Sequence, residues 1–126
     1  MIDAGNATVY VSDMDKAIDF YTNKLGCTLQ FRAGNHWAEV KAGRNLVIGL
    51  HPQTPHSPKP GTPGAVQIGL NVVEPLDKVM RTLEKRGVRF DGPMIEDEKS
   101  GNRFAMCRDL DGNPMYRWES TAARNC

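Results

Sequence analysis

A chain of 126 residues, of which 40% are hydrophobic and 25% are charged, is long enough for one domain whose core needs no disulfide bonds. Its 16 basic and 15 acidic residues give a net charge of +1, so the composition excludes the strongly basic surface of a typical nucleic-acid-binding protein. The sequence contains neither an apolar run of about 18 residues nor a signal-peptide pattern, and it therefore predicts a cytoplasmic protein with no membrane partner.

The first part of the chain predicts one strand, one helix and three further strands. Residues 6–11 are small, β-branched or aromatic, which is typical of a strand. Apolar residues then recur at spacings of three and four from Met14 to Leu25, and this period predicts an amphipathic helix at about 14–25. Gly26 follows as the residue that ends the helix. Three short strands are expected next, at 27–31, 37–41 and 46–51.

A proline-rich segment separates this unit from a second one. Residues 52–64 contain five prolines and two glycines. Because proline lacks a backbone donor and has a fixed φ, we expect a connector without regular structure. The second unit is predicted to comprise a strand at 66–72, a helix at about 74–86, and strands near 88–90 (resuming at 93–95), at 102–108 and at 113–119. A tight turn at 109–114 joins the last two strands.

The two units repeat one another at an offset of 61 residues. At this offset Val9 corresponds to Leu70, and Gly26 corresponds to Gly87. A tandem repeat of one supersecondary unit indicates two equivalent half-structures with a seam between them. The fold class predicted is therefore α+β, with two tandem βαβββ modules. The single domain comprises module one at 6–51, the connector at 52–64, module two at 66–119 and a tail without pattern at 120–126.

Three segments resemble the vicinal oxygen chelate superfamily, which includes glyoxalase I, extradiol dioxygenases, and fosfomycin- and bleomycin-resistance proteins. They are Val-Ser-Asp-Met-Asp-Lys-Ala-Ile-Asp-Phe-Tyr at 11–21, Leu-Gly at 25–26 and Asp-Leu-Asp-Gly-Asn-Pro at 109–114. The resemblance covers about residues 6–119. It implies the glyoxalase/bleomycin-resistance fold, in which two βαβββ modules form incompletely closed sheets that line a ligand cavity. It also implies a homodimer, commonly with each cavity built from modules of both chains.

The catalytic members of this superfamily hold a divalent metal in the cavity. The resemblance implies histidine or glutamate near the start of the first strand of each module, and glutamate near the middle of each last strand. Spacing from the Val-Ser-Asp and Gly-Asn-Pro segments assigns these positions to Asn6, Gly49, Gln67 and Tyr116. None of the four offers an imidazole, a thiolate or a carboxylate, so we expect neither a metal nor another cofactor there.

The three histidines leave a relocated metal site as an alternative. His36 and Glu39 are three residues apart on a predicted strand, so they face opposite sides and cannot both point into the cavity. His51 ends its strand at the rim, and His56 lies in the connector. Rim or surface positions are therefore the favoured interpretation of all three histidines, and the relocated site stays open.

Strand alternation predicts which residues line the cavity. With Asn6 facing inward, alternate residues of its strand do the same, while the intervening aliphatic residues pack under the helix. Arg117 departs from this pattern because it occupies a helix-side position, and we expect its charged end to reach the rim. The predicted ligand-binding residues are Asn6, Thr8, Tyr10, Trp37, Val47, Gly49, His51, Gln67, Asn71, Tyr116 and Trp118.

Aromatic walls with amide and hydroxyl groups suit a planar, partly apolar organic ligand, and the same aromatic residues are also typical of a dimer interface. The first functional hypothesis is a metal-free small-molecule-binding protein of the drug-sequestration type, similar to bleomycin-resistance proteins. The near-neutral charge argues against a cationic drug.

The alternative hypothesis is an enzyme of the same superfamily. It would be a glyoxalase-like lyase, an isomerase or a dioxygenase with a shifted metal, or with acid–base chemistry through His51, Glu39 or Tyr116. The sequence assigns neither the ligand nor a catalytic residue. A domain-swapped and a side-by-side dimer are both open.

Overall fold

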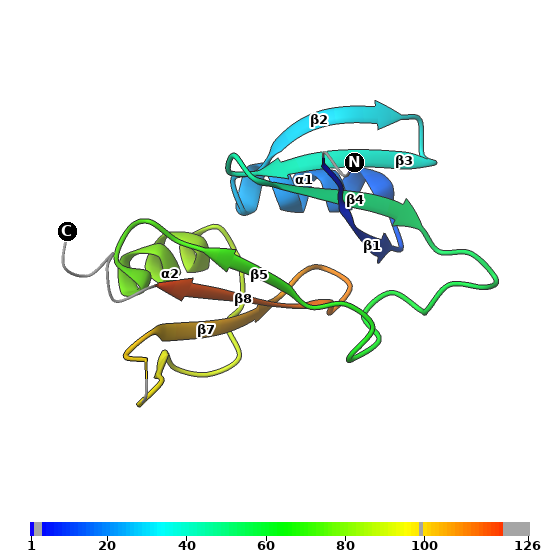
Figure 1. Ribbon diagram of the computed structural model, residues 1–126. Helices are drawn as coiled ribbons and strands as arrows, with labels where there is room; N and C mark the ends of the chain where they lie inside the picture. Colours follow the sequence, from blue (N-terminus) through cyan, green and yellow to red (C-terminus); the bar gives the residue numbers. More distant parts are fainter. Residues whose placement is uncertain (2–3, 99, 120–126) are drawn as a thin grey trace.

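The computed structural model describes residues 1, 4–98 and 100–119, so the tail expected at 120–126 lies outside the described residues. The chain forms two four-stranded sheets with strand orders β1-β4-β3-β2 and β5-β8-β7-β6. Figure 1 shows the first sheet above the second, with the connecting segment on the right. The predicted α+β fold class is confirmed.

The first sheet contains one parallel pair of strands and two antiparallel pairs. Its outer strand β1 runs parallel to β4, and β3 joins β4 to the other outer strand, β2. In chain order the elements are β1 (Ala7–Val11), α1 (Met14–Asp19), the π-helical turn η1 (Phe20–Lys24), β2 (Thr28–Ala33), β3 (Trp37–Ala42) and β4 (Leu46–Pro52).

The first helix begins where the sequence predicts it and ends differently. The side chain of Asp13 caps it by accepting a hydrogen bond of 3.0 Å from the amide of Lys16. Its last turn is π-helical, because the amide of Leu25 donates to the carbonyl of Phe20. This wider turn accompanies the burial of two adjacent aromatic side chains, Phe20 and Tyr21. Regular α-helical spacing does not predict that arrangement.

The second sheet repeats the first. Its outer strand β5 runs parallel to β8, and β7 joins β8 to β6. The strand expected at 88–90 is reduced to a single bridge between Phe90 and Cys107, because Gly92 (φ +103°) and the proline after it interrupt the pairing. The elements are β5 (Ile68–Asn71), α2 (Leu76–Lys85), β6 (Ile95–Glu96), β7 (Arg103–Arg108) and β8 (Pro114–Glu119).

A buried carboxylate fixes the second helix to its sheet. Glu119, on the last strand, is fully buried and accepts a hydrogen bond of 2.6 Å from the amide of Leu76. That amide is one of the donors at the start of α2 that lack a partner within the helix. A negative charge at this end also stabilises the helix dipole.

One hydrophobic core joins both sheets. Alternate strand residues such as Val9, Leu50, Ile68 and Met115 are buried and belong to a single apolar cluster. Arg117 lies on the same side of its strand and is only 5% exposed, so the expectation that it reaches the rim is wrong. Burial lowers the pKa of its guanidinium group.

The turn between β7 and β8 also joins the two modules. Asp109, which is almost fully buried, accepts hydrogen bonds from the hydroxyl of Tyr21 (2.8 Å) and from the amide of Asp111 (3.0 Å). It also accepts bonds of 2.9 Å from the amide and the side chain of Asn113. The first helix of one module is thereby bound to the last turn of the other.

Three further contacts extend this network. The side-chain amide of Asn113 donates to the carbonyl of Tyr10 at 3.2 Å, and its oxygen accepts from the amide of Gly61 at 3.0 Å. The hydroxyl of Ser12 donates to the carboxylate of Asp111. One short turn therefore holds the end of β1, the first helix and the connector together.

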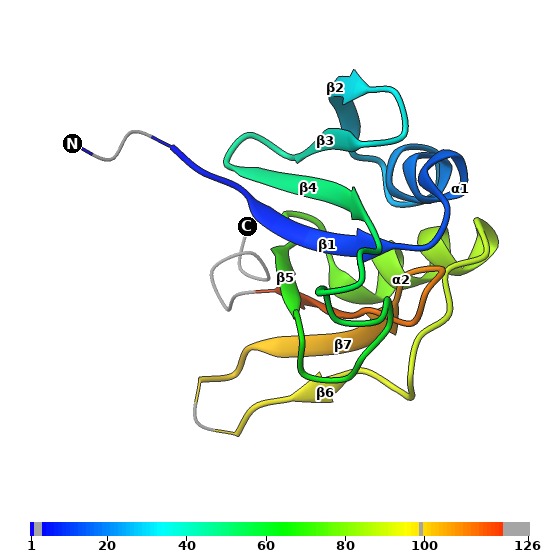
Figure 2. The ribbon, with the colours of Figure 1, turned by 90° about the vertical axis from the view of Figure 1, so that its right-hand side faces the viewer.

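The outer strands β2 and β6 lie at opposite ends of the molecule. Figure 2 shows β1 and β5 nearest to one another, with β2 and β6 farthest apart. None of the helices in the described ranges is long and apolar enough to cross a membrane.

Candidate functional site

The strand register places equivalent residues of the two modules in equivalent pairs. Thr8 of β1 lies opposite Gly49 of β4, and Gly69 of β5 lies opposite Tyr116 of β8. Residue 69 is 61 positions after residue 8, which is the offset of the sequence repeat. The two parallel strand pairs are therefore the structural counterparts of the repeat.

The carboxamide residues flank these pairs. Asn6 and Gln67 are exposed and come directly before β1 and β5. The side-chain oxygen of Asn6 accepts a long hydrogen bond of 3.4 Å from the hydroxyl of Thr8. Val47 is half-buried and lies opposite Lys41 on the neighbouring strand.

Three predicted site residues form a cluster on the outer face of the first sheet, which is the face turned away from the helix and the core. The ring of His51 makes edge contacts with Tyr10, at a centroid distance of 5.5 Å, and with Trp37, at 6.2 Å. All three side chains are half-buried, and their strand neighbours point into the core. We call Tyr10, Trp37 and His51 the first aromatic cluster.

The indole of Trp37 is held at two places. It covers Gly49, where an added Cβ would lie 2.7 Å from the Cζ2 atom of the ring. Its Nε1 donates to the carboxylate of Glu39 at 2.8 Å, and the other oxygen of Glu39 accepts from Gln30 at 3.1 Å. Gly49, assigned above to a metal position, thus provides the space in which the indole lies.

A second group of aromatic residues lies on the second sheet. Tyr116 covers Gly69, where an added Cβ would lie 2.9 Å from the Cε1 atom of the ring. The ring of Phe104 is 6.3 Å from that of Tyr116, and Trp118 lies opposite both Phe104 and Asn71. We call Phe104, Tyr116 and Trp118 the second aromatic cluster.

Sequence reasoning missed Gln30, Phe104 and the structural role of Glu39. Alternation along Arg103–Arg108 could have identified Phe104, because Ala105 and Cys107 of that strand are buried and Phe104 is on the opposite face. In the part of the chain that the structure describes, ring contacts run within each aromatic cluster and none joins the two. The predicted residues thus form two groups, one on each sheet.

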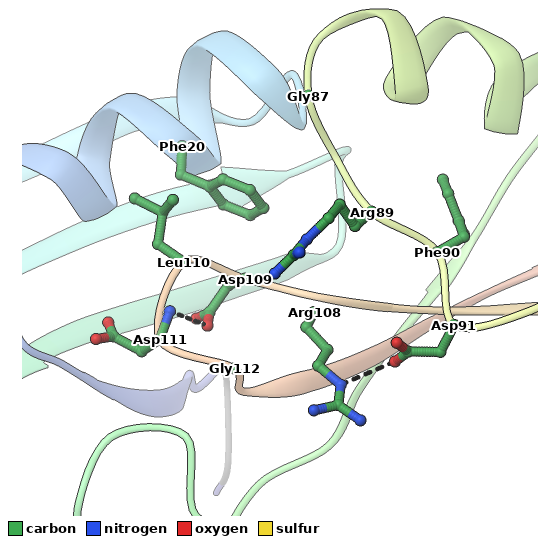
Figure 3. A pocket seen from close by; sticks show the side chains of 10 residues that line it. All are labelled: Phe20, Gly87, Arg89, Phe90, Asp91, Arg108, Asp109, Leu110, Asp111 and Gly112. Carbon is green, nitrogen blue, oxygen red and sulfur yellow. Dashed lines mark hydrogen bonds and ion pairs between the residues drawn. The ribbon is translucent and has the colours of Figure 1, made fainter.

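A separate cavity of about 640 Å³ lies at the seam between the modules. Phe20 from the first helix lines one side, and residues 87, 89–91 and 108–112 line the rest (Figure 3). Arg108 forms an ion pair of 2.8 Å with Asp91 there. None of the predicted ligand-binding residues lines this cavity.

Comparison with known families identifies the chain. A family model for the Glyoxalase/Bleomycin resistance protein/Dioxygenase superfamily matches residues 4–115. The chain belongs to this superfamily. The resemblance found in the sequence is thereby confirmed. Comparison with curated proteins finds no match.

Several solved structures are similar to the chain over almost their whole length. TnmS3, an antibiotic binding protein from Streptomyces sp. CB03234, is 29% identical, with a TM-score of 0.77 over 96% of this chain and 98% of that one. A superfamily member from Sphaerobacter thermophilus DSM 20745 is 29% identical, with a TM-score of 0.80 over 95% and 98%. A glyoxalase/bleomycin resistance protein from Streptomyces sp. CB03234 is 32% identical, with a TM-score of 0.69 over 90% and 98%.

The residues of this superfamily member do not fit the metal of its catalytic relatives. The positions implied by the resemblance offer two carboxamides, a glycine and a phenol, which are weak or absent ligands for a divalent ion. Among the described residues, no group of three or more His, Cys, Asp or Glu side chains could hold a metal. Both oxygens of Glu39 already accept hydrogen bonds, and His36 and His56 are exposed.

Proposed function

We propose that this protein binds a planar organic molecule against its aromatic clusters without a metal, as a cytoplasmic homodimer of the drug-sequestration type. The observation that carries the proposal is the position of Trp37, whose ring lies on Gly49 and is anchored by Glu39. A large ring fixed on the open face of a sheet is a preorganised surface for stacking, because little side-chain freedom remains to be lost on binding.

The relatives support this proposal. TnmS3, at 29% identity and with nearly full coverage of both chains, is described as an antibiotic binding protein. The enzyme alternative has less support, because Glu39 is engaged by Trp37 and Gln30 and the implied metal positions hold poor ligands.

A second copy of the chain would complete the site. The outer strands β2 and β6 carry exposed apolar side chains, namely Leu29 (42% exposed), Phe31 (52%) and Ile95 (56%). Strand edges of this kind are usually covered by a partner. We infer that the homodimer buries them, and that the partner covers the open face of each aromatic cluster.

A thermal-shift screen with planar aromatic compounds tests the proposal. Any compound that binds the native state raises the unfolding temperature, and Trp37→Ala, Tyr116→Ala or Trp118→Ala should reduce that rise. His56→Ala is the matched control, because His56 is exposed in the connector. A rise that these three aromatic substitutions leave unchanged would place the ligand elsewhere and refute the proposal.

A further inference from the structure

The backbone determines which nitrogen of His51 carries the proton. Its Nδ1 lies 2.7 Å from the carbonyl oxygen of Pro52. A carbonyl oxygen can only accept a hydrogen bond, so Nδ1 must be the donor. A neutral imidazole has one N–H group, and the other nitrogen, Nε2, therefore carries a lone pair.

The first aromatic cluster leaves this lone pair without a partner. Among the described residues, Pro52 is the one hydrogen-bond partner of the His51 ring. Edge contacts with Tyr10 and Trp37, at interplanar angles of 66° and 65°, hold the ring between two larger aromatic surfaces. A ligand that covers this half-buried acceptor must donate a hydrogen bond to it, since an unpaired buried polar atom destabilises the complex.

Two donors near the cluster are already used. The N–H of Trp37 is bonded to Glu39, and the side-chain amide of Gln30 is bonded to the same carboxylate. Glu39 lies directly opposite Gly49, which the indole of Trp37 covers. Its negative charge is therefore close to the proposed binding surface and disfavours an anionic ligand there. The face therefore offers an unpaired acceptor at His51, beside the ring of Tyr10, and it carries the carboxylate of Glu39.

We propose that the Nε2 atom of His51 accepts a hydrogen bond from the ligand, and that the site selects planar aromatic molecules with a hydroxyl or N–H group at the edge of the ring. This inference rests on the proposed function and adds the chemical class of the ligand. His51 acts here as a specificity-determining residue, and no covalent bond forms or breaks.

Two matched probes and three variants test the inference. The probes are 2-naphthol and 2-methoxynaphthalene, which share a ring system and an oxygen but differ in the hydroxyl proton. His51→Asn keeps an N–H donor near the Nδ1 position and removes the distal acceptor. His51→Gln places an amide oxygen near the Nε2 position, and His51→Phe keeps only a ring.

The native protein should bind 2-naphthol roughly tenfold more tightly than the methyl ether, as the loss of one buried hydrogen bond predicts. NMR titration provides both dissociation constants. His51→Gln should keep the preference, while His51→Asn and His51→Phe should lose it and still bind the methyl ether. His56→Gln, a substitution at the exposed histidine of the connector, should behave as the native protein does.

The outcomes separate this inference from the proposed function. Equal affinities of the native protein for the two probes, both weakened by Trp37→Ala, would overturn the role of His51 and leave the aromatic site intact. Equal loss of preference in His51→Gln and His51→Asn would also overturn it, since the ring or its Nδ1 would then be responsible. Binding of neither probe, or binding that Trp37→Ala does not affect, would overturn both.

Discussion

The indole ring of Trp37 lies on Gly49, diagonally across the β3–β4 pair in which Gly49 faces Glu39, and Tyr116 lies on Gly69, which it faces directly in the β5–β8 pair. Each glycine is on the outer face of its sheet and neither has a positive φ. Their conformations are thus open to any residue, and the close approach of the ring is what requires glycine. The two modules use the same device with different strands.

Gly49→Ala should displace the indole. The new Cβ overlaps the ring, so Trp37 must leave its position or the strands must separate, at a cost of about 1–3 kcal/mol of stability. We expect a lower free energy of unfolding, a shift of tryptophan emission and weaker binding of planar ligands.

Gly5→Ala is the control for this substitution, because nothing lies within 4 Å of a Cβ added at Gly5. A double-mutant cycle adds a second check. In a Trp37→Ala background, Gly49→Ala should lower the free energy of unfolding much less, since the clash with the indole is then removed. Equal costs in both backgrounds would mean that the ring does not occupy this space.

The pattern of residues predicted the sheets well and the packing between modules poorly. Alternation placed Val9 and Leu50 on the helix side of their strands and Tyr10 and His51 on the cavity side, because side chains on a strand alternate strictly between its faces. The repeat likewise predicted equivalent strand pairs. Both signals are local or periodic, and both are visible in a single chain.

Contacts between distant residues leave no such signal. Tyr21 and Asp109 are 88 positions apart, and nothing in either segment shows that the hydroxyl bonds to the carboxylate. The turn that contains Asp109 has the composition of an ordinary hairpin, and its role at the seam depends on the packing of the modules. The packing of the Trp37 indole on Gly49 could not be predicted for the same reason.

Tyr21→Phe should destabilise the protein at neutral pH. It removes the hydrogen bond of 2.8 Å to Asp109, a bond to a charged group that contributes about 1.5–3 kcal/mol. Burial, together with the charge and hydrogen bond of Asp109, raises the pKa of Tyr21 well above its usual value. Folding is therefore favoured as long as the unfolded tyrosine keeps its proton.

This shift predicts the direction of the pH dependence. The contribution of Tyr21 is fully present below the ordinary tyrosine pKa of about 10, and it declines above that value because the unfolded state loses a proton that the folded state retains. Urea unfolding at about pH 8 and about pH 10.5 should show that the free energy of unfolding falls more steeply with pH in the native protein than in Tyr21→Phe. Parallel losses would contradict the buried, protonated hydroxyl.

Phe31→Glu should weaken the proposed homodimer. Phe31 is 52% exposed on the outer strand β2, where a charge would oppose pairing with a second copy. Light scattering should find the native protein dimeric and the variant monomeric at micromolar concentration. Val73→Glu is the control, since Val73 is 86% exposed but lies outside the strands. A native protein that is already monomeric would refute the dimer.

The superfamily metal site should be restorable only in part. Asn6→His, Gln67→His and Tyr116→Glu supply imidazole and carboxylate ligands at three of the four positions. The fourth position, Gly49, cannot take glutamate while the indole of Trp37 fills the space beside it. A fourth ligand therefore requires Gly49→Glu together with Trp37→Ala.

We expect the native protein to contain no stoichiometric transition metal, because neutral amides cannot offset the charge of a divalent ion. The triple variant should bind zinc in a calorimetric titration, and the variant with five substitutions should bind it more tightly. Tighter zinc binding by the variant with five substitutions is expected only if the four positions converge on one cavity in the assembled protein. If elemental analysis instead finds zinc, manganese or iron in the native protein, and Asn6→Ala or Gln67→Ala removes it, the metal-free proposal fails and the enzyme alternative replaces it.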